Sequence, residues 1–182
     1  MKKLLLVATT ILVAFAFTSC DPVEKTKEEL LKQKNGWIIS QATCSPDYQL
    51  NNDEWCDTDL LNGGFFYVCE KDDIYYFKDD NSFMRNFGKD KCSGEDGKEE
   101  NMGRWALQEK DTWVQFYMTA YYDNANEEYF KLRGIIKELD ATTLRLEVPI
   151  DETSGLAKAH GLFRGEVHPY KGTFYLTFKV NK

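Results

Sequence analysis

The chain has 182 residues and a formal net charge of −7; hydrophobic residues make up 42% of it and aromatic residues 14%. This length suits one domain, and the apolar content excludes wholesale disorder. Lysine and arginine form no cluster after residue 20. Because nucleic-acid binding relies on clustered cations that contact phosphates, we expect a single globular domain with no nucleic-acid partner.

The beginning of the chain has the pattern of a bacterial lipoprotein signal. A short basic start precedes an apolar run over residues 4–17, which is shorter than the ~20 residues of a membrane-spanning helix and fits a signal peptide. Residues 17–20 (Phe-Thr-Ser-Cys) resemble a lipobox. The resemblance implies a signal peptide over 1–19 and a lipid on Cys20, with an ordinary secretory signal as the alternative.

Four further cysteines follow the lipidation site: Cys44, Cys56, Cys69 and Cys92. An oxidising extracytoplasmic compartment favours disulfides, and four cysteines allow three pairings. Pairing of neighbours in sequence would give Cys44–Cys56 and Cys69–Cys92, each worth about 3 kcal/mol. A zinc site is disfavoured, because structural zinc cysteines are usually separated by only about two to four residues.

Residues 20–26 are expected to form a lipidated tether and residues 27–182 the folded domain. Thr26 and Glu29 have the spacing of a capping box, and Asn35-Gly36 is a stop signal, which together predict a short helix over 27–34. Alternating apolar and polar residues then predict strands over 37–42, 73–77, 82–87, 103–107, 112–120, 130–137, 143–148, 162–167 and 173–180.

These strands are short and are separated by turn signals, which is typical of an all-β sandwich or barrel. Residues 78–81 carry hairpin turn chemistry, with Asn81 suited to a positive φ. Pro149 is expected to end the strand over 143–148, because proline is excluded from central strands. Since one face of most strands is polar, we expect antiparallel pairing.

Four motifs resemble those of the lipocalin-like lipoproteins of Gram-negative anaerobes. They are Asn35-Gly36-Trp37, the hairpin over 69–83, Lys91-Cys92 followed by Gly103-x-Trp105-x-Leu107, and Ile136-x-x-Leu139 followed by Leu144-x-Leu146. The resemblance covers roughly residues 31–148, with 173–180 as a closing strand. It implies an eight-stranded antiparallel barrel, a Cys69–Cys92 disulfide and no known chemistry.

The sequence predicts no enzyme, cofactor or metal site. His160 and His168 lack the spacing of a catalytic or metal-binding pair, and no phosphate-binding glycine loop is present in the sequence. Asp53, Asp57, Asp59 and Asn62 gather in one loop, but they lack the ligand spacing of an EF-hand. We interpret them as an acidic loop.

Nine apolar side chains are predicted to line a core or a cavity: Trp37, Tyr75, Phe77, Trp105, Phe116, Phe130, Leu144, Phe174 and Phe178. The family likeness suggests that Trp37 and Trp105 plug one end. An eight-stranded barrel either is packed with side chains or holds one small ligand, and both outcomes stay open. The family pattern turns Tyr75 and Phe77 inward, whereas strict alternation from Ile74 selects Tyr76.

Two functions fit these expectations. The preferred one is a lipid-anchored extracytoplasmic protein that binds a small apolar or amphiphilic ligand in a cavity of about 300 Å³ or more. The alternative is a surface module with a packed barrel that binds a protein or glycan through its loops over 44–64 and 88–102. Asp21, next to the lipidated cysteine, leaves the choice of membrane open. By analogy with the similar lipoproteins we predict the outer membrane, with surface display as an open question.

Overall fold

The computed structural model describes residues 24–45, 49–51, 54–55, 59–62, 66, 68–92, 98–121, 127–150 and 172–182. Eight strands close into a barrel in the order β1-β10-β9-β8-β7-β6-β5-β4, and β2 pairs with β3 in a separate small sheet. Neighbouring strands around the barrel run antiparallel. The all-β class and the eight-stranded antiparallel barrel are confirmed.

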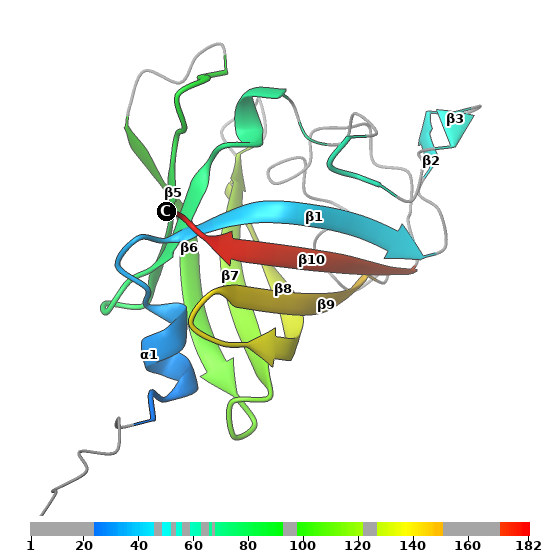
Figure 1. The fold of residues 1–182 in the computed structure, drawn as a ribbon. Helices are drawn as coiled ribbons and strands as arrows, with labels where there is room; N and C mark the ends of the chain where they lie inside the picture. The colour runs from blue at the N-terminus through cyan, green and yellow to red at the C-terminus, as the bar shows by residue number, and fades with distance from the viewer. Residues whose placement is uncertain are drawn as a thin grey trace, which may run out of the picture.

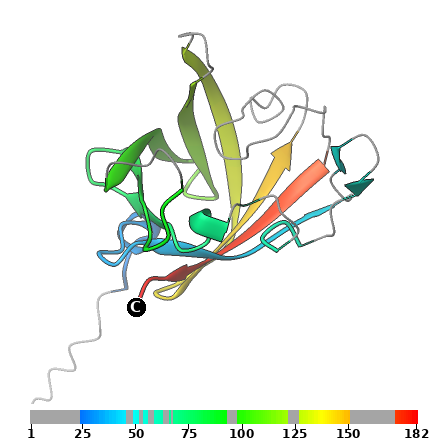
Figure 2. The same ribbon diagram turned by 90° about the horizontal axis from the view of Figure 1, so that it is seen from above.

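The bounds of the elements follow the predicted order along the chain. They are α1 (Lys27–Leu31), β1 (Trp37–Ser45), β2 (Gln49–Asn51), β3 (Glu54–Trp55), the 3-10 helix η1 (Val68–Glu70), β4 (Ile74–Phe77), β5 (Ser82–Asn86), β6 (Glu99–Gln108), β7 (Trp113–Tyr121), β8 (Glu127–Leu139), β9 (Thr143–Ile150) and β10 (Gly172–Val180). The barrel closes where the first strand meets the last, and Figures 1 and 2 show β1, β10 and β9 side by side.

Alternation along the strands separates the interior from the solvent. On β10, Phe174, Leu176 and Phe178 are buried, whereas Tyr175 between them is 43% exposed. On β4, Tyr75 and Phe77 are buried and Tyr76 is half-buried. The inward face of β4 is therefore the one that the family pattern indicates.

Helix α1 lies across one end of the barrel, which we call the helix end (Figure 1). The Thr26–Glu29 capping box forms as predicted, and Leu31 is fully buried. Side chains of the helix region reach two turns between strands: Lys27 Nζ donates to Asp111 O at 2.9 Å, and Gln33 Nε2 donates to Ala141 O at 2.7 Å. These contacts hold the helix against the barrel rim.

Three tight turns complete the helix end, over residues 78–81, 109–112 and 140–142. Asn81 takes a φ of 63°, as its turn chemistry predicts. At the opposite end, which we call the far end, β1, β5, β7 and β9 end and the other four barrel strands begin. There the Cys69–Cys92 disulfide joins the segment before β4 to the segment after β5, with a Cα–Cα distance of 5.3 Å.

Asp140 organises the turn between β8 and β9. One of its carboxylate oxygens accepts from Thr142 N at 2.6 Å, from the Thr142 hydroxyl at 2.9 Å and from Thr143 N at 2.8 Å. The hydrogen bond from the Thr142 backbone, followed by that from its hydroxyl, lowers the pKa of Asp140 below its ordinary value. The ionised carboxylate is therefore the form that stabilises the fold.

Asp140→Ala is expected to lower the urea midpoint at pH 7, because two backbone N–H groups lose their acceptor. A carboxyl group whose pKa is lowered in the folded state contributes stability above its unfolded pKa of about 3.9, and that contribution is lost as the pH falls. The difference between wild type and variant should shrink below about pH 4. Asp140→Asn keeps an oxygen acceptor and is the control; an unchanged difference at acidic pH would contradict this interpretation.

The structure corrects two predicted strand boundaries. Pro149 lies inside β9 and pairs with Thr173, whereas the predicted strand ended before it. On β9, only the residues from Leu144 to Glu147 pair with β8. Pro149 lies beyond this paired stretch, so no hydrogen bond to β8 is lost because proline has no backbone N–H. Strand β6 begins at Glu99 and passes through Gly103, whose φ of 135° accompanies a bulge opposite β5.

Two other elements differ from the predictions. Helix α1 is shorter than the predicted span of 27–34, and the polar connection over 44–64 carries the small β2–β3 hairpin. The strand predicted over 162–167 lies outside the described residues, as do the signal peptide and Cys20.

Candidate functional site in the barrel interior

The helix end of the interior is filled by aromatic rings. The ring centre of Phe77 lies 5.1 Å from that of Phe83, 5.3 Å from that of Trp105 and 5.9 Å from that of Phe116. Tyr75 stacks on Phe83 at 5.9 Å. Aromatic pairs at such distances add about 0.5–1.5 kcal/mol beyond their buried area, so this part of the barrel is a packed core.

Two tryptophans seal this end. Trp37 is fully buried and its Nε1 donates to Leu31 O, at the end of α1, at 2.8 Å. Trp105 is 2% exposed and its Nε1 donates to Lys78 O at 3.2 Å. The Lys32 ammonium lies 5.9 Å from the Trp105 ring centre. Both indole N–H groups thus have partners, and the rings separate the interior from the helix end.

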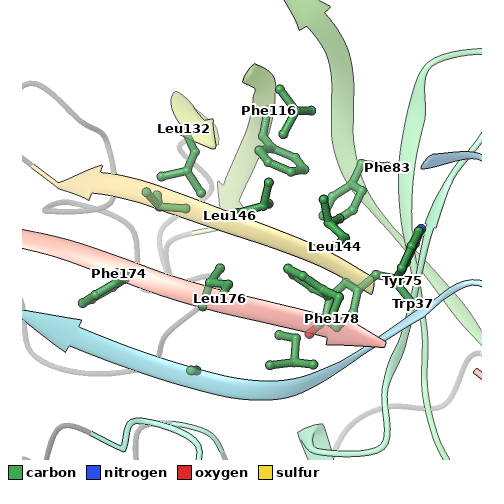
Figure 3. Close-up of a cluster of buried hydrophobic side chains, with 14 of the residues drawn as sticks. Trp37, Tyr75, Phe83, Phe116, Leu132, Leu144, Leu146, Phe174, Leu176 and Phe178 are labelled. Atoms are coloured by element: carbon green, nitrogen blue, oxygen red, sulfur yellow. The ribbon is translucent and has the colours of Figure 1, made fainter. Parts of the chain in front are cut away.

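Beyond the rings a cavity of about 30 Å³ lies within the barrel, and it is only partly enclosed. With the adjoining open space included, about 380 Å³ is not occupied by atoms. Ten side chains from β1, β4, β5 and β7–β10 line it: Ile39, Tyr75, Phe83, Phe116, Met118, Leu132, Leu146, Val148, Leu176 and Phe178. Figure 3 labels seven of them, all except Ile39, Met118 and Val148.

The interior was expected either to be packed with side chains or to hold a small ligand, and the enclosed volume lies between these two alternatives. It is large enough for about two water-sized groups and far below the ~300 Å³ of a site for a drug-sized ligand. The barrel is thus mostly packed around a narrow apolar cavity. Any ligand held there must be slender or must displace side chains.

Tyr75 borders the cavity with its ring, and the wall presents no polar surface to the cavity. Tyr75 is 4% exposed, and its ring packs edge-on to Phe178 with ring centres 6.1 Å apart. Figure 3 shows its hydroxyl reaching past the ring toward Phe178. Among the residues that the structure describes, no hydrogen bond joins this hydroxyl to a side chain or to the backbone. The other nine wall side chains are hydrocarbon or thioether groups.

A charged network borders Tyr75 on the side of the far end. Arg85 is paired with Tyr75 across β4 and β5, so both point to the barrel interior. Its guanidinium lies 3.2 Å from a carboxylate oxygen of Asp73, 2.7 Å from one of Glu100 and 3.5 Å from one of Glu70. The Asp73 side chain is fully buried and also accepts from Gly88 N at 3.0 Å.

Burial, and after it the charge of Asp73, raises the pKa of the Tyr75 hydroxyl above its ordinary value. Burial alone would lower the pKa of the Arg85 guanidinium. The nearby carboxylates, Glu100 most strongly, outweigh this effect, so the pKa is raised above its ordinary value. Tyr75 therefore stays protonated and is able to donate or accept a hydrogen bond. Arg85 stays charged, as a buried partner of three carboxylates requires.

The structure brings most of the predicted lining residues together. Trp37, Tyr75, Phe77, Trp105, Phe116, Leu144, Phe174 and Phe178 are all buried in one core cluster. Only Tyr75, Phe116 and Phe178 of these border the cavity. The backbone of Phe130 pairs with Met118, but its side chain lies outside what the structure describes.

Seven wall residues are not among the nine predicted lining residues: Ile39, Phe83, Met118, Leu132, Leu146, Val148 and Leu176. Alternation placed most of them on inward faces, so extending each apolar face along its strand would have found them. Arg85 had no such signal, because an isolated arginine in a strand usually faces the solvent.

The remaining predicted sites are described only in part. Cys44 is buried on β1, whereas Cys56, its expected partner, lies outside the described residues. So do Asp53, Asp57 and both histidines. The Asp59 carboxylate accepts from Leu61 N and from the backbone and side chain of Asn62, so it serves as a local turn acceptor.

In the described ranges, no group of three His, Cys, Asp or Glu side chains is placed to hold a metal ion. No helix of the described part is long and apolar enough to span a membrane. No protein-family model, curated protein or solved structure matches the chain.

Proposed function

We propose that the chain is a lipocalin-like binding protein, anchored to the outer membrane by a lipid on Cys20, that takes up a small apolar or amphiphilic ligand of narrow cross-section. The observation that carries the proposal is the partly enclosed apolar cavity inside a barrel whose helix end is sealed. Ligand sites are typically concave and lined mostly by apolar side chains, and this cavity has such a lining.

The direction of entry follows from the arrangement of the barrel. Trp37, Trp105 and α1 occupy the helix end, so a ligand would enter from the far end. Val148, Met118 and Leu132 line the cavity along β9, β7 and β8. They offer an apolar path whose burial favours a hydrocarbon chain by about 25 cal/mol per Å².

The test is native mass spectrometry of the Cys20→Ser protein secreted into an oxidising periplasm. We expect an additional mass that leaves on gentle activation, together with uptake of oct-1-ene from the vapour above the protein solution. Val148→Leu adds a methylene to the cavity wall and should weaken uptake about fivefold or more, because overpacking costs about 1–3 kcal/mol.

Val68→Leu is the matched control, because Val68 is 76% exposed and the same methylene is then added at the surface. An apo mass together with no uptake of oct-1-ene by the wild-type protein would overturn the proposal. It would favour the alternative of a surface module that binds a protein or glycan, which the largely packed aromatic core also suits.

A further inference from the structure

We propose that Gly134 sets the width of the cavity and so restricts the part of the ligand held there to an unbranched hydrocarbon chain. This inference rests on the binding function proposed above, and it names a residue that determines specificity together with the chemical class that fits. It follows from three observations: a glycine that the backbone does not require, two wall side chains packed beside it, and a narrow wall without polar surface.

The first observation is the glycine itself, which lies inside strand β8. Gly134 is buried on the inward face, two residues after the wall residue Leu132. Glycine in a strand interior loses conformational entropy on folding and contributes no packing of its own. Unlike Gly36 and Gly103, it does not have a positive φ, so alanine can adopt the same backbone conformation. The reason for a glycine here is therefore the close approach of other groups.

The second observation is the packing around Gly134. A Cβ atom there would lie 3.2 Å from Leu146 Cδ1, 3.2 Å from Val114 Cγ1 and 3.4 Å from Phe116 Cε2. These distances are shorter than the optimal carbon–carbon contact of about 3.5–4.0 Å, so the neighbours would have to move. Leu146 and Phe116 border the cavity, and the free space beside them is the cavity itself. The missing side chain of Gly134 therefore lets both wall side chains stand back and keeps the cavity open.

The third observation is the shape and chemistry of the wall. Three strands each contribute two successive inward side chains to it: Phe116 and Met118, Leu146 and Val148, and Leu176 and Phe178. Successive inward positions lie about 7 Å apart along a strand, yet the enclosed volume is only about 30 Å³. The cavity is therefore narrow for its length. Its wall presents no polar surface, and a polar group buried without a hydrogen bond is unfavourable, so a single hydrocarbon chain fits best.

The experiment compares two hydrocarbons with eight carbon atoms each, oct-1-ene and cyclooctane, in the Cys20→Ser protein. Their uptake is measured by the partition of each probe between vapour and protein solution. Cyclooctane is the wider molecule and would have to push the walls apart. We expect oct-1-ene to bind about fivefold or more tightly than cyclooctane, which is the usual effect of overpacking.

Gly134→Ala should weaken the uptake of oct-1-ene about fivefold or more, because Leu146 and Phe116 are pushed into the cavity. The urea midpoint should stay the same or rise, since alanine restricts the unfolded chain more than glycine does. Adding Leu146→Val removes the δ carbon nearest to position 134 and should restore uptake. Ser40→Thr is the control, because it adds one methyl group at an exposed position of β1, and it should change neither uptake nor stability.

Several results would overturn the inference while the binding function stands. They are binding of cyclooctane as tight as that of oct-1-ene, undiminished uptake by Gly134→Ala, and uptake that Leu146→Val does not restore. A lower urea midpoint for Gly134→Ala would also overturn it, because Leu146 and Phe116 would then be unable to move into the cavity. No uptake of either probe by the protein without these substitutions would overturn both proposals.

Discussion

Trp37→Ala is expected to lower the free energy of unfolding by about 3–5 kcal/mol, the usual cost of removing a large buried aromatic side chain. Trp37 is fully buried, and its indole N–H is the hydrogen-bond donor that ties the end of α1 to the barrel. Its loss would leave a cavity at the helix end and release the Leu31 carbonyl. The measurement is equilibrium urea denaturation of the secreted, oxidised protein.

Trp113→Ala is the control for this variant. Trp113 lies on the outer face of β7, half-buried, with the Arg133 guanidinium 4.5 Å from its ring centre. The same truncation there leaves no internal cavity and should cost clearly less. If Trp37→Ala were as stable as Trp113→Ala, the tryptophan would not be the seal that we infer.

Arg85→Met is expected to destabilise the fold by about 3–5 kcal/mol, because removing one partner of a buried ion pair leaves uncompensated charge. Its guanidinium is the cation between Glu70, Asp73 and Glu100, and the Asp73 side chain is fully buried. Urea denaturation at pH 7.5 measures this loss of stability.

A second substitution and a surface pair make this test specific. Adding Asp73→Asn to Arg85→Met should recover part of the lost stability, because it removes a buried negative charge. Arg145→Met breaks the surface ion pair between Arg145 and Glu138, whose charged atoms are 3.0 Å apart. The side chain of Arg145 is 55% exposed and that of Glu138 is 39% exposed. Such surface pairs contribute about 0–1 kcal/mol, so an equal loss for Arg145→Met and Arg85→Met would contradict the role of the buried network.

Much of the barrel wall could be predicted because its strands keep a strict period of two. The residues of β10 and of β9 up to Val148 alternate cleanly, and both strands appear close to where alternation places them. The closure of the strands into a barrel did not follow from periodicity, since a sandwich has the same alternation. That step came from the family resemblance and depends on contacts between Trp37 and Val180, which no local pattern encodes.

The site could be predicted less completely than the fold. The aromatic cluster followed from residue type and face, but the size of the cavity depends on how Phe83, Phe116 and Met118 fill the space between strands. Such packing is decided by side-chain conformations across the whole barrel. The inward position of Arg85 depends on carboxylates that come from three separate segments, and sequence alone does not bring these together.

The pairing of the first strand with the last sets the order in which the chain can become folded. Trp37 is paired with Val180, and Asn181 N donates to Gly36 O at 3.1 Å. Such distant pairings slow folding to about milliseconds to seconds, because the intervening chain must lose its freedom first. Until β10 arrives, the β10-facing edges of β1 and β9 present unpaired backbone groups, which are templates for association with other chains. A chain that ends before residue 172 would keep both edges open and would be prone to aggregate.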